Sequence, residues 1–221
     1  MVLPTPLRGS LVACHPHPLF GGTMTNKVVH SMYKAFRDAG FAAIRFDFRG
    51  AGESEGEHGQ GITELLDVQA AAAQLDAAVA RLAPTTPGPR VLGGFSFGSL
   101  VGLRAASEDP DYTHRIGIGP PLAPDLPGDR EYDWSFLLDS SDRRPLVLVA
   151  GDQDEFCPSA EFVRFVERLR SSGIPVEARL VPEANHFFDR KGHVLRELLE
   201  GVAARVAGLP VPDPSFPTTA V

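Results

Sequence analysis

Short strand-like runs alternate with longer helical patterns along most of this chain. The helical patterns place apolar residues on one face, as at Val29, Met32 and Phe36. Alternation of this kind builds a parallel sheet with helices on both faces. The sequence therefore predicts a three-layer α/β sandwich with a mostly parallel sheet of about six strands. The predicted strands cover residues 10–14, 41–48, 90–94, 115–119, 145–150 and 176–181.

The composition is ordinary for a soluble globular protein. The chain has 221 residues, which is enough for one sizeable core, and 43% of them are hydrophobic. Its net charge of −7 argues against a nucleic acid or an anionic membrane as partner. No apolar stretch is long enough to span a bilayer. We expect one domain over residues 1–208, followed by a flexible Pro-rich tail over residues 209–221.

Two cysteines, Cys14 and Cys157, lie far apart and form no CxxC pattern. The N-terminus also lacks the charged and apolar layout of a signal peptide. Two reduced thiols in the cytoplasm are therefore expected. The sequence leaves open a single bridge between them.

The stretch Gly94-Phe95-Ser96-Phe97-Gly98 follows a predicted strand and opens a predicted helix. A serine hydroxyl is a poor nucleophile unless it is exposed, held near a base and placed beside hydrogen-bond donors. A sharp strand-to-helix turn meets these needs, and it requires small neighbours because strand and helix come close. The pattern predicts Ser96 as a nucleophile.

A nucleophile in this setting needs an acid and then a histidine further along the chain. Three acids follow the predicted strand over residues 145–150. We favour Asp154, with Asp152 as second choice and Glu155 as third. His186 follows the last predicted strand, where an imidazole can reach the serine. The remaining candidates lack such a position and are interpreted as structural or exposed: His30, His58, His114 and His193.

The first predicted strand runs into His15-Pro16-His17-Pro18-Leu19. Acyl transfer builds negative charge on an oxygen, and two backbone N–H donors would stabilise it. We expect one donor at Phe97, next to the nucleophile, and the second in this loop. Prolines have no N–H, so His17 and Leu19 are the candidates, and we prefer His17. The two histidines supply too few ligands for a structural zinc, and we expect no metal or cofactor.

With these residues in view, the chain resembles the α/β-hydrolases, and more narrowly small bacterial members related to the dienelactone-hydrolase branch. The resemblance rests on HPHPLFGGTMTNKVV, RFDFRGAGESEG, GGFSFGS, GDQDEFCP and NHFF, in this order. It implies the α/β-hydrolase fold with Ser96, Asp154 and His186 as the triad. Relatives begin with an antiparallel strand pair, for which only about nine residues are available here, so that pair is expected to be missing.

The connection over residues 120–144 is too short for a cap domain, so we expect an open site. Apolar side chains near the proposed catalytic positions predict a substrate pocket. The predicted function is a serine esterase acting on small carboxylic esters. An amidase, peptidase or thioesterase with the same triad, or a non-catalytic binding protein, are the alternatives. The predicted pocket residues are Leu19, Phe20, Trp134, Phe156 and Phe187.

Overall fold

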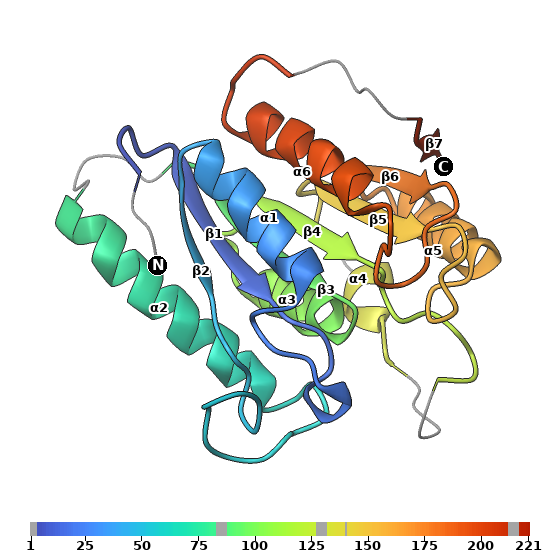
Figure 1. The fold of residues 1–221 in the computed structure, drawn as a ribbon, viewed down its shortest axis with the longest axis horizontal. Helices are drawn as coiled ribbons and strands as arrows, with labels where there is room; N and C mark the ends of the chain where they lie inside the picture. Colours follow the sequence, from blue (N-terminus) through green and yellow to red (C-terminus); the bar gives the residue numbers. More distant parts are fainter. Residues whose placement is uncertain (1–3, 83–87, 127–131, 140, 212–216) are drawn as a thin grey trace.

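One sheet forms the centre of the molecule (Figure 1). The computed structural model describes residues 4–82, 88–126, 132–139, 141–211 and 217–221. The sheet's seven strands within these ranges run in the order β2-β1-β3-β4-β5-β6-β7. The first six are parallel, and β7 is antiparallel to β6. The strands are β1 (Gly9–Cys14), β2 (Phe41–Arg45), β3 (Arg90–Phe95), β4 (His114–Ile118), β5 (Leu146–Gly151), β6 (Val176–Val181) and β7 (Thr219–Ala220).

Helices cover both faces of this sheet, which confirms the predicted three-layer α/β-hydrolase sandwich. Helices α1 and α6 pack on one face, whereas α2, α3 and α5 pack on the other. Figure 1 shows α1 and α6 side by side in front of the strands. The helices are α1 (Lys27–Asp38), α2 (Glu64–Leu82), α3 (Phe97–Glu108), α4 (Ser135–Leu138), α5 (Ser159–Ser171) and α6 (Gly192–Val206), with a short 3₁₀ helix η1 (Pro18–Phe20).

Helix α1 shows how local sequence sets these elements. The Asn26 side chain accepts a hydrogen bond from Val28 N at 2.9 Å, which caps the first turn. Val29, Met32 and Phe36 share the buried face, and all three are fully shielded from solvent. The cap and the apolar stripe together fix where the helix begins and which side meets the sheet.

The connection from β4 to β5 contains only the four-residue helix α4 among its described residues. This agrees with the expected absence of a cap domain. No helix within the described ranges is long and apolar enough to cross a membrane. Within the described part of this connection, loops and α4 border the carboxyl ends of the parallel strands.

Two features differ from the sequence-based expectation. The end of the tail is not loose, because Thr219–Ala220 pairs with β6 and closes that edge of the sheet as a seventh strand. The middle of the tail, residues 212–216, lies outside the described residues. Strand β2 ends at Arg45, three residues earlier than predicted. Beyond it, Phe48 N donates to the His15 side chain, at 2.8 Å from Nε2, instead of to a neighbouring strand.

Candidate active site

The parallel register brings the candidate side chains to one edge of the sheet. Cys14 at the end of β1 is the partner of Gly94 in β3, and Gly151 at the end of β5 is the partner of Val181 in β6. The residues that follow these strands therefore lie together, although they are far apart in sequence. This edge is where ligands bind in open α/β sheets.

Ser96, His186 and Asp154 form one hydrogen-bonded chain across this edge. His186 Nε2 lies 3.0 Å from Ser96 Oγ. On the other side of the ring, His186 Nδ1 lies 2.8 Å from Asp154 Oδ2 and 2.9 Å from Oδ1. The other two acids of this loop, Asp152 and Glu155, are exposed to solvent. Of the three acids considered, the geometry brings Asp154 to the histidine.

The loop after β5 holds the Asp154 carboxylate in place. Its Oδ1 accepts hydrogen bonds from the backbone N–H groups of Phe156 and Cys157, both at 2.9 Å. An ionised carboxylate only accepts, so Nδ1 of His186 carries a hydrogen and Nε2 presents its lone pair to the serine. This is the tautomer that can accept the hydroxyl proton.

Ser96 occupies a strained turn between β3 and α3. Its backbone has φ +55° and ψ −126°, a region that costs a residue with a side chain roughly 1–3 kcal/mol. A Cβ atom at Gly94 would lie 2.0 Å from Gly98 O, and one at Gly98 would lie 2.4 Å from His15 O. Both glycines are therefore required by close backbone approach, as expected for a serine held out above the sheet.

The two proposed oxyanion donors lie on segments that pack together. The rings of His17 and Phe97 are 4.8 Å apart. Phe97 is the first residue of α3, so its N–H has no acceptor within the helix. In the loop after β1, Leu19 N donates to His17 Nδ1 at 3.2 Å, so the alternative donor is already engaged. These contacts favour His17 over Leu19.

His15 has a structural role in the same loop. Its Nε2 accepts from Phe48 N at 2.8 Å and its Nδ1 lies 2.6 Å from Pro16 O. Burial lowers the pKa of this histidine, which keeps the ring neutral and suits both bonds. The described residues contain no group of three or more His, Cys, Asp and Glu side chains placed to hold a metal.

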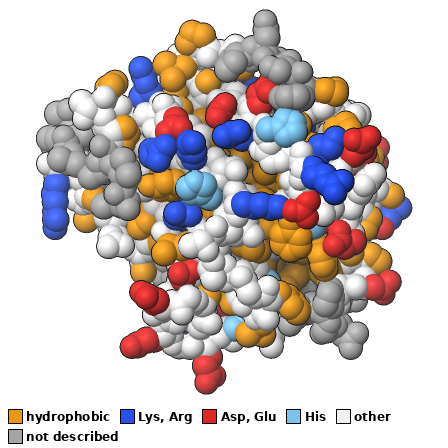
Figure 2. Space-filling model, in the orientation of Figure 1, with side chains coloured by type: hydrophobic (Ala, Val, Ile, Leu, Met, Phe, Trp, Pro, Cys, Tyr) orange, Lys and Arg blue, Asp and Glu red, His pale blue; other side chains and the backbone are white. Residues whose placement is uncertain are grey.

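An apolar cavity of about 250 Å³ opens beside the Ser96 hydroxyl. Figure 2 shows hydrophobic side chains gathered below a band of charged ones on one face of the molecule. Near the site, the exposed fractions of Phe20 and Phe187 are 62% and 41%. The large apolar side chains among the described residues that line the cavity are Phe20, Phe97, Leu126, Tyr132, Phe156 and Phe187, and Pro16 and Pro121 complete its apolar lining.

Three of the five expected pocket residues line this cavity, and two do not. Leu19 is 62% exposed and lies outside it. Trp134 is buried against Phe165 in the core near α5, with ring centroids 5.1 Å apart. The sequence analysis misses Leu126 and Tyr132, because the connection between β4 and β5 has no periodicity that would indicate which side chains face the cavity.

Comparisons with known proteins agree with this fold. The family model described as serine aminopeptidase S33 matches residues 6–138, and the model of the prolyl oligopeptidase family matches residues 127–203. An uncharacterised protein of Rickettsia prowazekii, RP471, is 33% identical over 179 residues, which cover 80% of this chain and 71% of that protein.

Solved structures resemble the chain over nearly its whole length. One is a putative α/β hydrolase of Agrobacterium tumefaciens, 31% identical with a TM-score of 0.78, covering 96% of this chain and 93% of that one. Another is XC6422 of Xanthomonas campestris, described as an α/β serine hydrolase without lid. It is 31% identical with a TM-score of 0.72, covering 96% and 88%. The chain therefore belongs to the α/β-hydrolase family whose model is described as serine aminopeptidase S33.

Proposed function

We propose that this protein is a serine hydrolase that cleaves small carboxylic esters through an acyl-enzyme intermediate. The observation that carries the proposal is the hydrogen-bonded chain of Ser96, His186 and Asp154 at the mouth of an apolar cavity. A histidine that contacts a hydroxyl on one side and a buried carboxylate on the other is the arrangement that activates a serine.

In the proposed first half-reaction, Ser96 Oγ attacks the ester carbonyl carbon while its proton moves to His186 Nε2. The carbonyl oxygen becomes an oxyanion, which accepts hydrogen bonds from the N–H groups of His17 and Phe97. The intermediate then collapses, and the alcohol leaves with the proton from His186. Asp154 stabilises the imidazolium that exists between these two transfers.

The second half-reaction repeats these steps with water. His186 Nε2 takes a proton from a water molecule as its oxygen attacks the acyl carbon. The oxyanion forms again at the same two amides. Collapse releases the carboxylic acid, and the proton returns to Ser96 Oγ. Removing a single oxyanion donor from a known serine hydrolase costs about 10²–10³ in kcat, which is the scale expected for each amide here.

The cavity supports a small, uncharged ester. None of the described residues that line it is Lys, Arg, Asp or Glu, and its walls are mainly apolar. A volume of about 250 Å³ suits a small ligand, since sites for drug-sized ligands run to ≈ 300–1,000 Å³. The HPHPLFGG loop supports the further proposal that the chain is related to the dienelactone-hydrolase branch of the α/β hydrolases.

The same triad can cleave amides and thioesters, and both matching family models carry names of peptidases. We favour esters because none of the described residues around the cavity offers a charged side chain to hold a peptide terminus. A cytoplasmic location, no cofactor and no nucleic-acid or membrane partner complete the proposal. Cys14 and Cys157 are free, and burial raises the pKa of both thiols, so neither is poised to react.

The proposal is tested with a fluorophosphonate probe and three substrates of matched size: a p-nitrophenyl ester, a thioester and a p-nitroanilide. We expect labelling, a burst of p-nitrophenol and the highest rate on the ester. Ser96→Ala should lose labelling and turnover. Ser107→Ala is the matched control, because this serine lies on the same helix but bonds only to Leu103 O at 2.9 Å.

Two outcomes would count against the proposal. Absence of labelling in a folded wild-type protein would favour the non-catalytic alternative. A higher rate on the anilide or the thioester would keep the serine chemistry but replace the ester assignment.

A further inference from the structure

A second buried carboxylate lies beside the proposed oxyanion donors, and the triad does not use it. Glu64 is the first residue of α2, and it is completely shielded from solvent. Its Oε1 accepts a hydrogen bond from Gly59 N at 2.7 Å, and its Oε2 accepts one from Gly61 N at 2.9 Å. The carboxylate therefore holds the loop that leads into its own helix.

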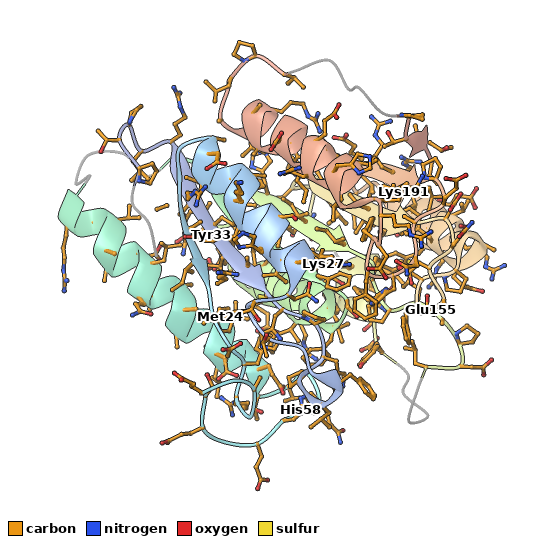
Figure 3. The ribbon with its side chains drawn as sticks, in the orientation of Figure 1. Met24, Lys27, Tyr33, His58, Glu155 and Lys191 are labelled. Carbon is orange, nitrogen blue, oxygen red and sulfur yellow. The ribbon has the colours of Figure 1, made fainter. Side chains whose placement is uncertain are left out.

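His58 completes this cluster. Its Nδ1 lies 2.7 Å from Glu64 Oε1, so the ring is in direct contact with the carboxylate. The His58 ring is 4.5 Å from that of His17 and 5.2 Å from that of Phe97. Figure 3 shows His58 beside η1, at the end of the molecule where the loops after β1 and β2 lie. His58 thus touches both residues whose amides are proposed to hold the oxyanion.

The loop itself is held in a conformation that needs support. Gln60 has φ +56° and Gly61 has φ +85°, both in the left-handed region. A Cβ atom built at Gly61 would lie 3.4 Å from Phe97 Cε2, so the loop backbone packs against that ring. The two hydrogen bonds to Glu64 hold this turn against Phe97, and hydrogen bonds to a charged acceptor are the strong ones.

A fully buried carboxylate is costly, and a neutral side chain could cap an ordinary turn. Asp67, one helical turn along α2, offers a comparison. It also ties down a loop, by accepting bonds from Arg49, but its side chain is 18% exposed and that of Arg49 is 26% exposed. Of these two carboxylates, Glu64 is the one that combines full burial with contacts that lead to His17 and Phe97.

We propose that Glu64 is a positioning residue which, through His58 and the loop over residues 59–61, fixes the amides of His17 and Phe97 where the oxyanion forms. This inference rests on the proposed function. Glu64 itself touches neither the substrate nor the reacting atoms. Because the oxyanion exists only in the transition state and the intermediate, displaced donors should lower kcat and leave KM nearly unchanged.

The test compares Glu64→Gln with Asp67→Asn. Both changes replace a carboxylate on α2 by its amide, but only the first contacts His58. For a p-nitrophenyl ester at 25 °C, we expect kcat of Glu64→Gln to fall about 10- to 100-fold, since a displacement of 1 Å costs about 10² in rate. KM should stay within about twofold. Asp67→Asn should lower Tm and leave kcat unchanged. A loss of Tm in both variants with kcat retained in both would overturn the inference.

His58→Gln supplies the second variant should Glu64→Gln fail to fold. If the two residues act as one unit, the double variant should be no slower than the slower single variant, because coupled residues are non-additive. Additive losses in the double variant would overturn the pathway through His58.

Backbone amide signals measured by NMR separate this inference from the proposed function. The ¹⁵N–¹H signals of His17 and Phe97 should shift in Glu64→Gln or His58→Gln and stay in place in Asp67→Asn. Unchanged signals in the first two variants would overturn the inference whatever the substrate. A wild-type protein that the fluorophosphonate fails to label would overturn the proposed function and leave the amide result standing.

Discussion

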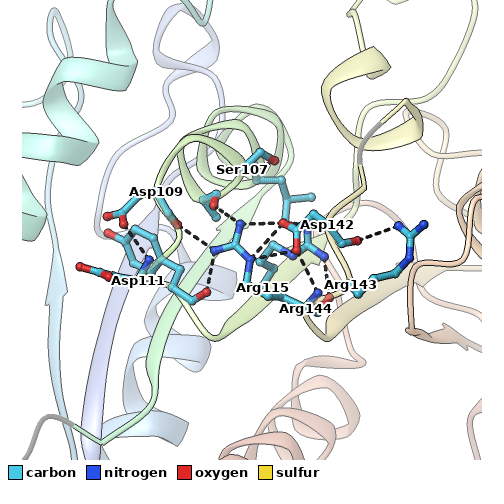
Figure 4. Close-up of polar contacts among 10 residues, drawn as sticks. Ser107, Asp109, Asp111, Arg115, Asp142, Arg143 and Arg144 are labelled. Carbon is cyan, nitrogen blue, oxygen red and sulfur yellow. Dashed lines mark hydrogen bonds and ion pairs between the residues drawn. The ribbon is translucent and has the colours of Figure 1, made fainter.

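Strand β5 has a carboxylate of low exposure beyond each of its ends, and the two have different partners. Asp154 follows the carboxyl end, with 3% of its surface exposed, and shares two short contacts with His186. Asp142 precedes the amino end, with 11% of its side chain exposed, and lies between Arg115 and Arg144 (Figure 4). Both carboxylates have hydrogen-bond partners, but those of Asp154 include an imidazole and those of Asp142 include guanidinium groups.

At the amino end, the partners are permanent cations. Arg115 is fully buried, and its Nη1 donates to Asp142 Oδ2 at 2.9 Å. Arg144 donates to the same carboxylate, and it also donates to the backbone oxygens of Asp109 and Tyr112, both at 2.7 Å. Guanidinium groups do not release protons in proteins. This network therefore joins the end of α3 to the segment before β5 and has no proton to transfer.

At the carboxyl end, the partner is an imidazole, which can take and return a proton near neutral pH. Its second nitrogen faces Ser96 Oγ, and that hydroxyl opens on a cavity instead of on packed side chains. The comparison teaches that burial of a carboxylate does not by itself mark a catalytic site. What distinguishes the two ends is whether its partner can exchange a proton and whether a substrate can reach it.

The largest expected effect follows from changing Asp154. In Asp154→Asn, the amide oxygen can still accept from Phe156 N and Cys157 N, so the loop should stay folded. The other tautomer of His186 is then favoured, and the expected loss of kcat is about 10⁴. Ester turnover and Tm are measured together. Asp152→Asn in the same loop is the control and should keep full activity. A comparable loss in the control, or full activity in Asp154→Asn, would contradict the comparison.

The next effect concerns stability at the other end of β5. Asp142→Ala leaves Arg115 buried without its carboxylate, and breaking a buried pair costs about 3–5 kcal/mol. At roughly 2–4 °C of Tm per kcal/mol for a domain of this size, the melting temperature should fall by about 6–20 °C. The kcat of the folded protein at low temperature should not change. Asp38→Ala, which breaks an exposed pair with Arg37, serves as control with little shift in Tm.

A smaller effect appears in acid. Burial alone would raise the pKa of Asp142, but hydrogen bonds from Arg144 and the charge of Arg115 outweigh it and hold that pKa below its usual value. A carboxyl group of this kind stabilises the fold above about pH 4, the ordinary pKa of Asp, and its contribution is lost as the pH falls through the lowered value. The free energy of unfolding of Asp142→Asn should therefore fall less than that of the wild type between pH 5 and pH 3. Parallel falls in urea titrations would refute the assignment.

Most of the fold follows from the sequence because strands and helices differ in period. Each predicted strand overlaps an observed one, since buried runs such as Leu146–Gly151 are bounded by turns. Strand β7 has only two residues, and its pairing with β6 depends on where a long tail returns. No local pattern specifies that return, so the tail is the part of the fold that the sequence predicts least well.

The candidate site also has residues that the sequence predicts and residues that it does not. Ser96, Asp154 and His186 are predictable because each follows a strand, and the topology then brings the strand ends together. Leu126 and Tyr132 are not predictable, because they lie in an irregular connection whose path determines which side chains face the cavity. For His58 the sequence favours a structural or exposed position, and it does not indicate the contact with Glu64, because that contact depends on a left-handed loop that no periodicity predicts.

The smallest effect is expected at an exposed ion pair near the carboxyl end of the sheet. This pair tests whether closeness to the site is enough to affect activity. Lys27 at the start of α1 pairs with Asp189 in the loop after β6, three residues beyond His186, and both side chains are more than half exposed. Solvent screens such pairs, and exposed pairs contribute about 0–1 kcal/mol. Lys27→Ala should therefore change the free energy of unfolding by less than about 1 kcal/mol and leave kcat unchanged. A tenfold loss of kcat would mean that this pair holds the His186 loop, and proximity to the site would then matter more than burial and proton exchange.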